Sequence, residues 1–232
     1  MKQSEKIQHE TKIKVQVKTL AGTGEQGRYI GSFFKDPRQA SLNSPWDIVY
    51  CQKTLYIAMA GQHQIWLLNT QGIGLYSGSG REDIIDGPPH DAAFAQPSGL
   101  SLAQSLLYVV DAETSAIRCI DRQNASTTTL VGSGLFIFGD KTGKGTQARL
   151  QHPLDIVWDM QRQGLWIADT YNNKIKFFSC VTTEVSDLIT IGLNEPNGLA
   201  LYQNTLWIAN TNEHGIVRYD LTQKTSTLLI PH

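Results

Sequence analysis

The stretch LWIADTYNNKI, residues 165–175, occurs in the chain in four related versions. The other three align with it without a gap: LYIAMAGQHQI (55–65), LYVVDAETSAI (107–117) and LWIANTNEHGI (206–216). Each version starts with an aromatic and β-branched run that is too short for an ordinary helix, and a polar turn follows. The chain therefore repeats one supersecondary unit.

A proline precedes each version and marks the start of an earlier run, at Pro45, Pro97, Pro153 and Pro196. Proline suits the first residue of a strand, where no backbone donor is needed. Two residues later each unit has Gly or Asp, followed by Ile or Leu. The units recur at roughly 40–60 residues, which is the range of a β-propeller blade.

Four short strands are expected in every unit. In the third unit they are predicted at 154–158, 165–169, 175–179 and 184–189. The sequence thus predicts an all-β fold, a β-propeller with four recognisable four-stranded blades. The blades are expected at about 46–80, 98–134, 154–190 and 197–230. Together with one earlier strand, they make a single propeller domain over 13–232.

Polar residues end three of the second strands, at Asp111, Asp169 and Asn210. Side chains of this kind bond nearby backbone amides, and we expect them to cap the turn that follows each strand. The first unit has Met59 at this position.

The chain's first part does not complete another blade. Residues 1–12 read as a polar leader, and 13–20 read as the outer strand of a preceding blade. An incomplete ring leaves blade faces uncovered. We therefore expect self-association through the open blade edges.

Composition narrows the function further. The chain has 232 residues, 41% of them hydrophobic, and a formal net charge of -1. This charge supplies no strong field toward nucleic acid or a membrane surface. Its three cysteines, Cys51, Cys119 and Cys180, fit neither a disulfide framework nor a CxxC pair. These features predict a cytoplasmic protein with free thiols, and nothing in the sequence requires a metal or another cofactor.

The repeated pattern, a Pro-x-(Gly/Asp) start followed by a strand such as 165–175, resembles the NHL repeat. The resemblance implies a six-bladed ring, of which these units would be part. The branch that it resembles carries a thioredoxin-like domain before the propeller. This chain shows no such segment and no CxxC, so no redox activity is implied.

Loops on a rigid scaffold commonly carry binding specificity. In antiparallel blades, the starts of the first strands and the turns between second and third strands share one face. We expect a non-catalytic protein-interaction scaffold that binds a protein partner on this face. The candidate binding residues are Asp47, His63, Asp155, Tyr171, Asn172, Asn197 and His214.

Two alternatives stay open. Residues 197–200 and 206–210 resemble lactonases of the SMP-30/gluconolactonase type, which imply a Ca²⁺ or Zn²⁺ ion; of their ligands only Asn197 finds a match. Some NHL propellers bind single-stranded RNA, for which the basic loop 141–149, with Tyr171 and Lys174, is the local candidate.

Overall fold

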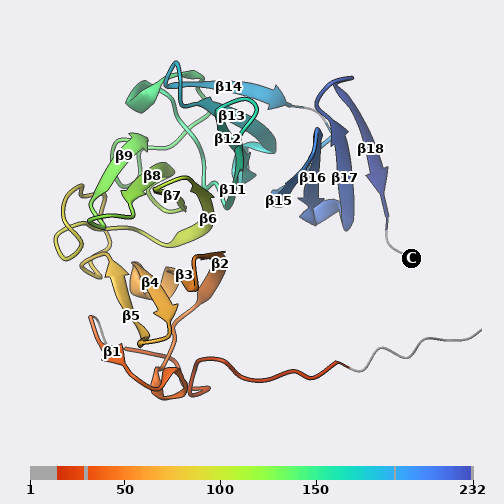
Figure 1. Ribbon diagram of the computed structural model, residues 1–232. Helices are drawn as coiled ribbons and strands as arrows, with labels where there is room; N and C mark the ends of the chain where they lie inside the picture. The colour runs from red at the N-terminus through yellow and green to blue at the C-terminus, as the bar shows by residue number, and fades with distance from the viewer. Residues whose placement is uncertain (1–14, 29–30, 191, 231–232) are drawn as a thin grey trace, which may run out of the picture.

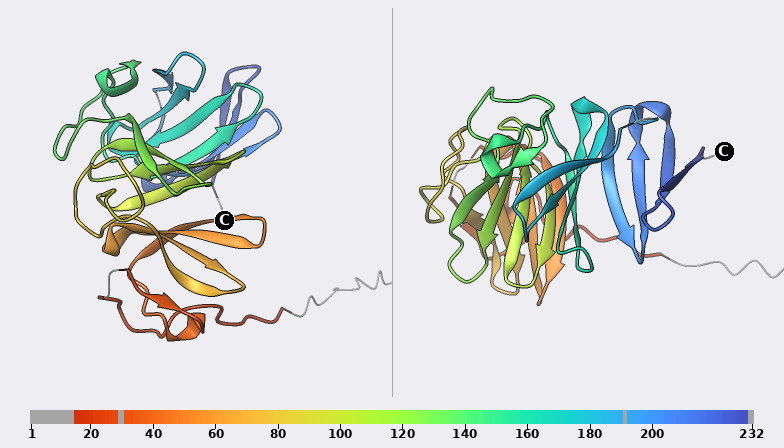
Figure 2. Two further views of the ribbon diagram at one scale, coloured as in Figure 1. Left: turned by 60° about the vertical axis from the view of Figure 1, so that its left-hand side comes forward. Right: turned by 90° about the horizontal axis from the view of Figure 1, so that it is seen from above.

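The computed structural model describes residues 15–28, 31–190 and 192–230. They form four antiparallel sheets arranged as blades along an arc (Figure 1). Consecutive blades lie side by side in the further views (Figure 2). The predicted all-β propeller fold is confirmed.

The first blade contains β1 (Phe33–Phe34), β2 (Pro45–Cys51), β3 (Thr54–Met59), β4 (Gln64–Asn69) and β5 (Gly72–Ser77), in the order β1-β5-β4-β3-β2. The second contains β6 (Pro97–Ala103), β7 (Leu106–Asp111), β8 (Ala116–Asp121) and β9 (Thr127–Val131). The third contains β10 (Gly143–Lys144), β11 (Asp155–Asp159), β12 (Gly164–Asp169), β13 (Lys174–Ser179) and β14 (Glu184–Ile189), with β10 outermost. The fourth contains β15 (Pro196–Tyr202), β16 (Thr205–Asn210), β17 (Gly215–Asp220) and β18 (Thr225–Leu229). Five short 3-10 turns are described: η1 (Pro37–Gln39), η2 (Ala60–Gln62), η3 (Gly145–Gln147), η4 (Thr170–Asn172) and η5 (Thr211–Glu213).

The outer edges differ from the sequence prediction. The short strands β1 and β10 pair with β5 and β14 and were not anticipated. The strand expected over 13–20 is absent from its described part, residues 15–20, while residues 13 and 14 lie outside the described residues. A blade's outer strand needs a neighbouring strand to pair with, and none of the described strands lies beside this segment (Figure 1).

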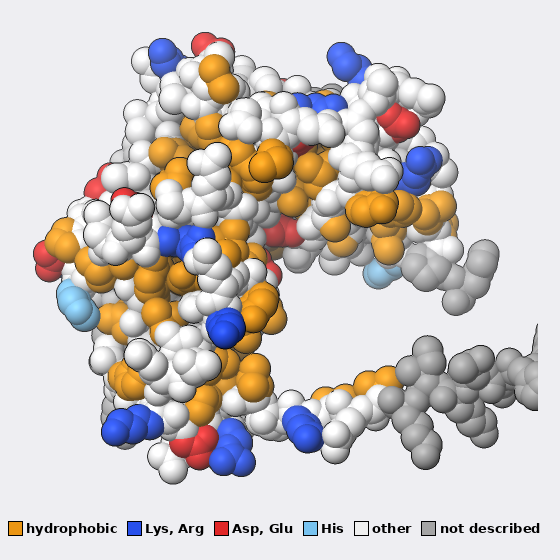
Figure 3. Space-filling view, viewed as in Figure 1, with side chains coloured by type: hydrophobic (Ala, Val, Ile, Leu, Met, Phe, Trp, Pro, Cys, Tyr) orange, Lys and Arg blue, Asp and Glu red, His pale blue; other side chains and the backbone are white. Residues whose placement is uncertain are grey.

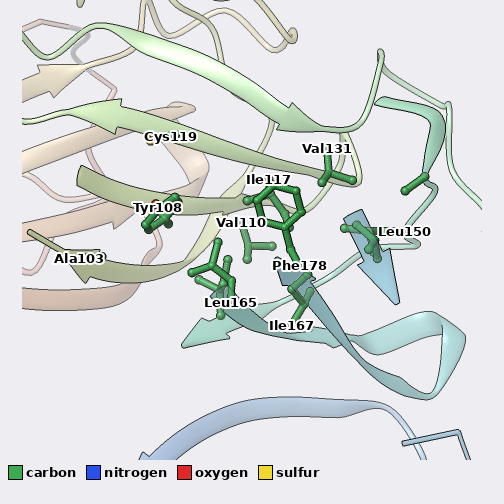
Figure 4. Close-up of a cluster of buried hydrophobic side chains, with 13 residues drawn as sticks. Ala103, Tyr108, Val110, Ile117, Cys119, Val131, Leu150, Leu165, Ile167 and Phe178 are labelled. Carbon is green, nitrogen blue, oxygen red and sulfur yellow. The ribbon is translucent and has the colours of Figure 1, made fainter. Parts of the chain in front are cut away.

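Each pair of neighbouring blades encloses an apolar layer. Between the second and third blades, the buried side chains include Val110, Ile117, Leu165 and Phe178 (Figure 4). Leu150 enters the same layer from the connection between the blades. Full burial of such a side chain contributes roughly 1.5–3 kcal/mol. These layers hold the arc together.

Buried ion pairs lie inside the second and third blades. The Arg118 guanidinium lies 3.5 Å from the Asp111 carboxylate, and Lys176 Nζ lies 3.0 Å from Asp169. All four side chains are inaccessible to solvent. The pairs join the end of each second strand to the third strand.

The other two blades replace this ion pair with uncharged residues. Strand register places Met59 and Trp66 at the equivalent positions in the first blade, and Asn210 and Val217 in the fourth. Trp66 is fully buried, and its Nε1 donates to Gln64 Oε1. The unusual Met59 is therefore matched by loss of the cation opposite it.

The capping prediction for the second-strand ends needs a correction. The amides that these side chains accept belong to the connection before each blade, and not to the turn that follows. The bonds are Ala95 N to Asp111, Gln151 N to Asp169 and Asn194 N to Asn210, each 2.7 Å long. The incoming connection needs these acceptors because it runs beside the second strand without a ladder of its own.

The arc is open between its first and fourth blades (Figure 3). Ile48 and Tyr50 are exposed on the first blade, and Tyr202, Ile216 and Leu229 are exposed on the fourth. Blade faces of this kind are covered where a neighbour exists. Self-association through them stays a prediction.

A matched pair of glycines tests how closely the blades must approach. An alanine Cβ at Gly99 would lie 2.7 Å from Asp155 Cα in the next blade. At Gly198, the equivalent position on the open side, it would meet only Ala209 Cβ at 3.5 Å. We expect Gly99→Ala to lower the free energy of unfolding by about 1–3 kcal/mol and Gly198→Ala to change it by less than about 0.5 kcal/mol. Urea denaturation measures both, and equal losses would contradict the blade contact as the cause.

The ion pairs allow a second test. Lys176→Val leaves the buried Asp169 carboxylate without its cation, which is expected to cost about 3–5 kcal/mol of unfolding free energy. The double variant Asp169→Asn/Lys176→Val copies the uncharged pair of the fourth blade and should recover most of that loss. Urea unfolding of both variants decides it. A double variant that is no more stable than the single one would show that the uncompensated charge is not the reason.

Candidate binding site

The first strands of the four blades, β2, β6, β11 and β15, begin on one face, here called the strand-start face. Where they converge, a cavity of about 490 Å³ opens. It is lined by Pro45, Trp46, Asp47, Ser98, Gly99, Leu154, Asp155, Asn197 and Gly198. The structure thus brings together three of the predicted residues, Asp47, Asp155 and Asn197. Trp46 was not predicted as a binding residue, although its position directly after a strand-start proline places it on this face.

Two carboxylates of this cavity bridge neighbouring blades. Asp47 accepts the amide of Ile48 in its own blade and that of Leu100 in the second blade, both at 2.7 Å. Asp155 does the same between the third and fourth blades, accepting Ile156 N at 2.7 Å and Leu199 N at 2.6 Å. Both oxygens of each carboxylate are therefore engaged by backbone.

Burial changes the acidity of these groups. Removal from water raises the pKa of Asp155 to about 7, although its bonds from Leu199 and Ile156 oppose the rise. The negative charge of Asp47 raises it further. Burial also raises the pKa of Asp47. The cavity therefore contains two carboxyl groups that hold protons more tightly than exposed ones.

The predicted turn residues have local bonding roles. His63 and His214 each take the left-handed conformation that closes the turn after the second strand, with φ of 54° and 51°. His63 Nδ1 accepts the amide of Gln96 at 3.2 Å, and His214 is exposed. Asn172 donates from Nδ2 to Gly139 O and to Asp169, both at 2.8 Å. These residues lie apart from the central cavity.

A second, smaller cavity also opens on the strand-start face. Its volume is about 190 Å³, and it is lined by Glu113, Ser115, Phe136, Phe138, Gln151, His152 and Tyr171. Of the predicted residues, only Tyr171 lies here. The apolar run 135–138 inside a polar connection was the available signal for the others.

The structure gathers fewer of the residues that the lactonase-like and RNA-binding alternatives would need. Among the described residues, no group of three or more His, Cys, Asp or Glu side chains is placed to hold a metal ion. In the basic loop, Arg149 donates to the carbonyls of Thr146 and Ala148, and Lys174 pairs with Asp140 and Asp187. Among the described helices, none is long and apolar enough to cross a membrane.

The fold and the recurring strand starts define a β-propeller built from one repeated unit. Among the proteins similar to this chain, NHL repeat-containing protein 2 of Bos taurus is 38% identical over 256 residues, covering 90% of this chain and 35% of that protein. Protein SUPPRESSOR OF QUENCHING 1, chloroplastic, of Arabidopsis thaliana is 38% identical, covering 89% of this chain and 22% of that protein. The chain therefore spans about a third or less of these relatives. The predicted NHL-repeat propeller is confirmed.

No family model matches the chain. Among solved structures, virginiamycin B lyase from Staphylococcus aureus superimposes with a TM-score of 0.55 at 14% identity, over 82% of this chain and 56% of that one. A streptogramin B lyase structure also gives 0.55, at 13% identity, over 80% of this chain and 54% of that one. Identity this low establishes a shared fold alone.

The acidity of Asp155 is directly measurable. Because its pKa in the folded chain, about 7, exceeds the ordinary 3.8, the folded state binds a proton that the unfolded state releases. Its contribution therefore favours folding at acidic pH and is lost as the pH rises through about 7. Carboxyl ¹³C NMR should show a midpoint near this value, and Asp47→Asn should lower it by removing the neighbouring charge. An ordinary midpoint, or one that Asp47→Asn leaves in place, would contradict the coupling.

Proposed function

We propose that this propeller is a non-catalytic scaffold that binds a polypeptide on its strand-start face. The observation that carries the proposal is the central cavity of about 490 Å³, to which all four blades contribute. A surface shared by four blades has its shape set by the whole arc, and not by one mobile loop. Such a surface suits recognition of an extended or folded partner.

The chemistry of the cavity favours binding over catalysis. Asp47 and Asp155 each use both carboxylate oxygens to accept backbone amides. Their lone pairs therefore serve to join blades. Trp46, by contrast, has 49% of its surface exposed at the rim. Exposed tryptophan is enriched among residues that dominate protein interfaces.

The lining of the central cavity supports the lactonase-like alternative. Asp47, Asp155 and Asn197 line the same cavity, and carboxylate and amide oxygens are the kind of ligand that a hard cation prefers. A metal-dependent hydrolase would then be stabilised by Ca²⁺ or Zn²⁺ through this cavity. A rise in melting temperature with either ion that Asn197→Ala abolishes would favour this alternative. The RNA-binding alternative stays a prediction.

Matched variants test the scaffold proposal. Trp46→Ala/Asn197→Ala removes two exposed side chains from the central cavity, while Met160→Ala/Val181→Ala removes two exposed side chains from the opposite face. We expect both variants to melt like the wild type. The first should lose bound polypeptides about 10-fold or more in quantitative affinity capture, because each deleted hot-spot side chain costs roughly 1–2 kcal/mol. The second should retain them.

Equal recovery by the two variants would overturn the proposal. A Ca²⁺- or Zn²⁺-dependent hydrolysis of lactone substrates that the first variant loses would favour the enzyme alternative instead.

A further inference from the structure

The smaller cavity of the strand-start face has mainly aromatic walls. Phe136 and Phe138 come from the connection after β9, and Tyr171 comes from η4 in the third blade. The ring of His152 stacks on Tyr171, with centroids 4.6 Å apart and planes 12° from parallel. His152 is itself held by a bond from its amide to Ser115 Oγ, 3.1 Å long. One wall of the cavity is thus fixed by the blade framework.

The three aromatic side chains of this cavity are exposed. Phe136 is 78% accessible to solvent, Phe138 is 56% and Tyr171 is 52%. Ile137, between the two phenylalanines, is exposed as well. Gathered apolar exposure is disfavoured in water and commonly marks an interaction site.

The backbone of Phe136 is also unusual. Its φ is +62°, a left-handed conformation that is unfavourable for a bulky side chain. The other described non-glycine residues with positive φ all lie in hairpin turns or before the strand-start prolines, places that recur from blade to blade. Phe136 alone among the described residues lies outside this repeated pattern. Its conformation therefore serves this connection and not the propeller framework.

A single carboxylate completes the cavity. Glu113 is half-buried in its wall, and within the described part of the chain no hydrogen bond or ion pair engages its carboxylate. No lysine or arginine lines the cavity. The nearby cation Lys174 is engaged by Asp140 and Asp187. The cavity thus combines aromatic side chains with a carboxylate that no described cation pairs with.

We propose that this cavity binds the cationic side chain of a lysine or arginine on a partner polypeptide. Aromatic faces attract ammonium and guanidinium groups through their quadrupole, and Glu113 supplies the opposite charge. A volume of about 190 Å³ fits one long side chain, since cavities for drug-sized ligands begin at roughly 300 Å³. The inference rests on the proposed scaffold function, of which it names the recognised group.

Capped amino acids are sufficient probes. We would titrate the ¹⁵N-labelled full chain with N-acetyl-lysine amide, N-acetyl-arginine amide and the uncharged N-acetyl-norleucine amide. The two cationic probes should shift the amide signals of Glu113, Ser115 and Tyr171 at millimolar concentration. Norleucine should bind at least about 10-fold more weakly, because it keeps the apolar stem and lacks the charge. Equal binding of norleucine, or no shift with either cation, would overturn the proposal.

Two variants assign the interaction to named groups. Glu113→Gln keeps the side-chain volume and should weaken lysine binding about 5–20-fold, with less effect at high salt. Phe136→Gly removes one aromatic wall and relieves the left-handed strain, so it should weaken binding about 10-fold while the melting temperature stays level or rises. Loss of binding without loss of stability separates recognition from folding.

Thr183→Gly is the matched control. Thr183 also has a positive φ, +59°, but lies in the turn between β13 and β14, outside the cavity lining. This variant should leave lysine binding unchanged. Unchanged binding by Glu113→Gln or by Phe136→Gly would contradict the assignment.

The experiments distinguish failure of this inference from failure of the scaffold proposal. If polypeptide capture falls with Trp46→Ala/Asn197→Ala but lysine binding is absent, the scaffold stands and this inference falls. If lysine binds as expected while polypeptide capture is unaffected by the variants of either cavity, the cavity is a cation site and the scaffold proposal falls.

Discussion

The strand-start face depends on one repeated hydrogen bond. At the end of the second strand in three blades, a buried Asp or Asn accepts the amide of the connection that leads into the blade. This bond sets where the connection turns before the strand-start proline, and so where the first strand begins. A buried amide left without its acceptor would cost about 1–3 kcal/mol. The positions of Asp155 and Asn197 at the central cavity follow from this geometry.

The first blade shows which part of that arrangement can be replaced. Met59 stands where the other blades have the acceptor, and the third strand opposite has Trp66 instead of a cation. An isolated buried carboxylate is strongly destabilising, whereas a packed apolar pair of similar volume is tolerated. In the first blade, both the acceptor and the cation are therefore replaced by uncharged residues. The blade retains its shape because Trp66 and Met59 fill the core beside Ile73.

Repetition explains how far the sequence alone leads. Four strands of the third blade, β11 to β14, were predicted to within one residue, because period, proline and apolar pattern agree there. Convergence of Asp47, Asp155 and Asn197 was predictable, since all blades begin on one face. Their pairing with the amides of the next blade was not, because a repeat describes one unit and not its neighbour. The cavity around Phe136 was missed for a related reason: the apolar run 135–138 does not recur in the corresponding connection, 78–96.

The open side of the arc links stability to recognition. Gly99 packs against the backbone of the next blade, whereas Gly198, its counterpart, faces almost empty space. Asn197, beside Gly198, lines the central cavity at this uncovered edge. A surface that covers the fourth blade there must also border the cavity, because one strand start contributes to both. A partner that covers the open side of the arc would therefore change the shape of the central cavity. The aromatic cavity, which is bordered by the second and third blades, would not be changed in this way.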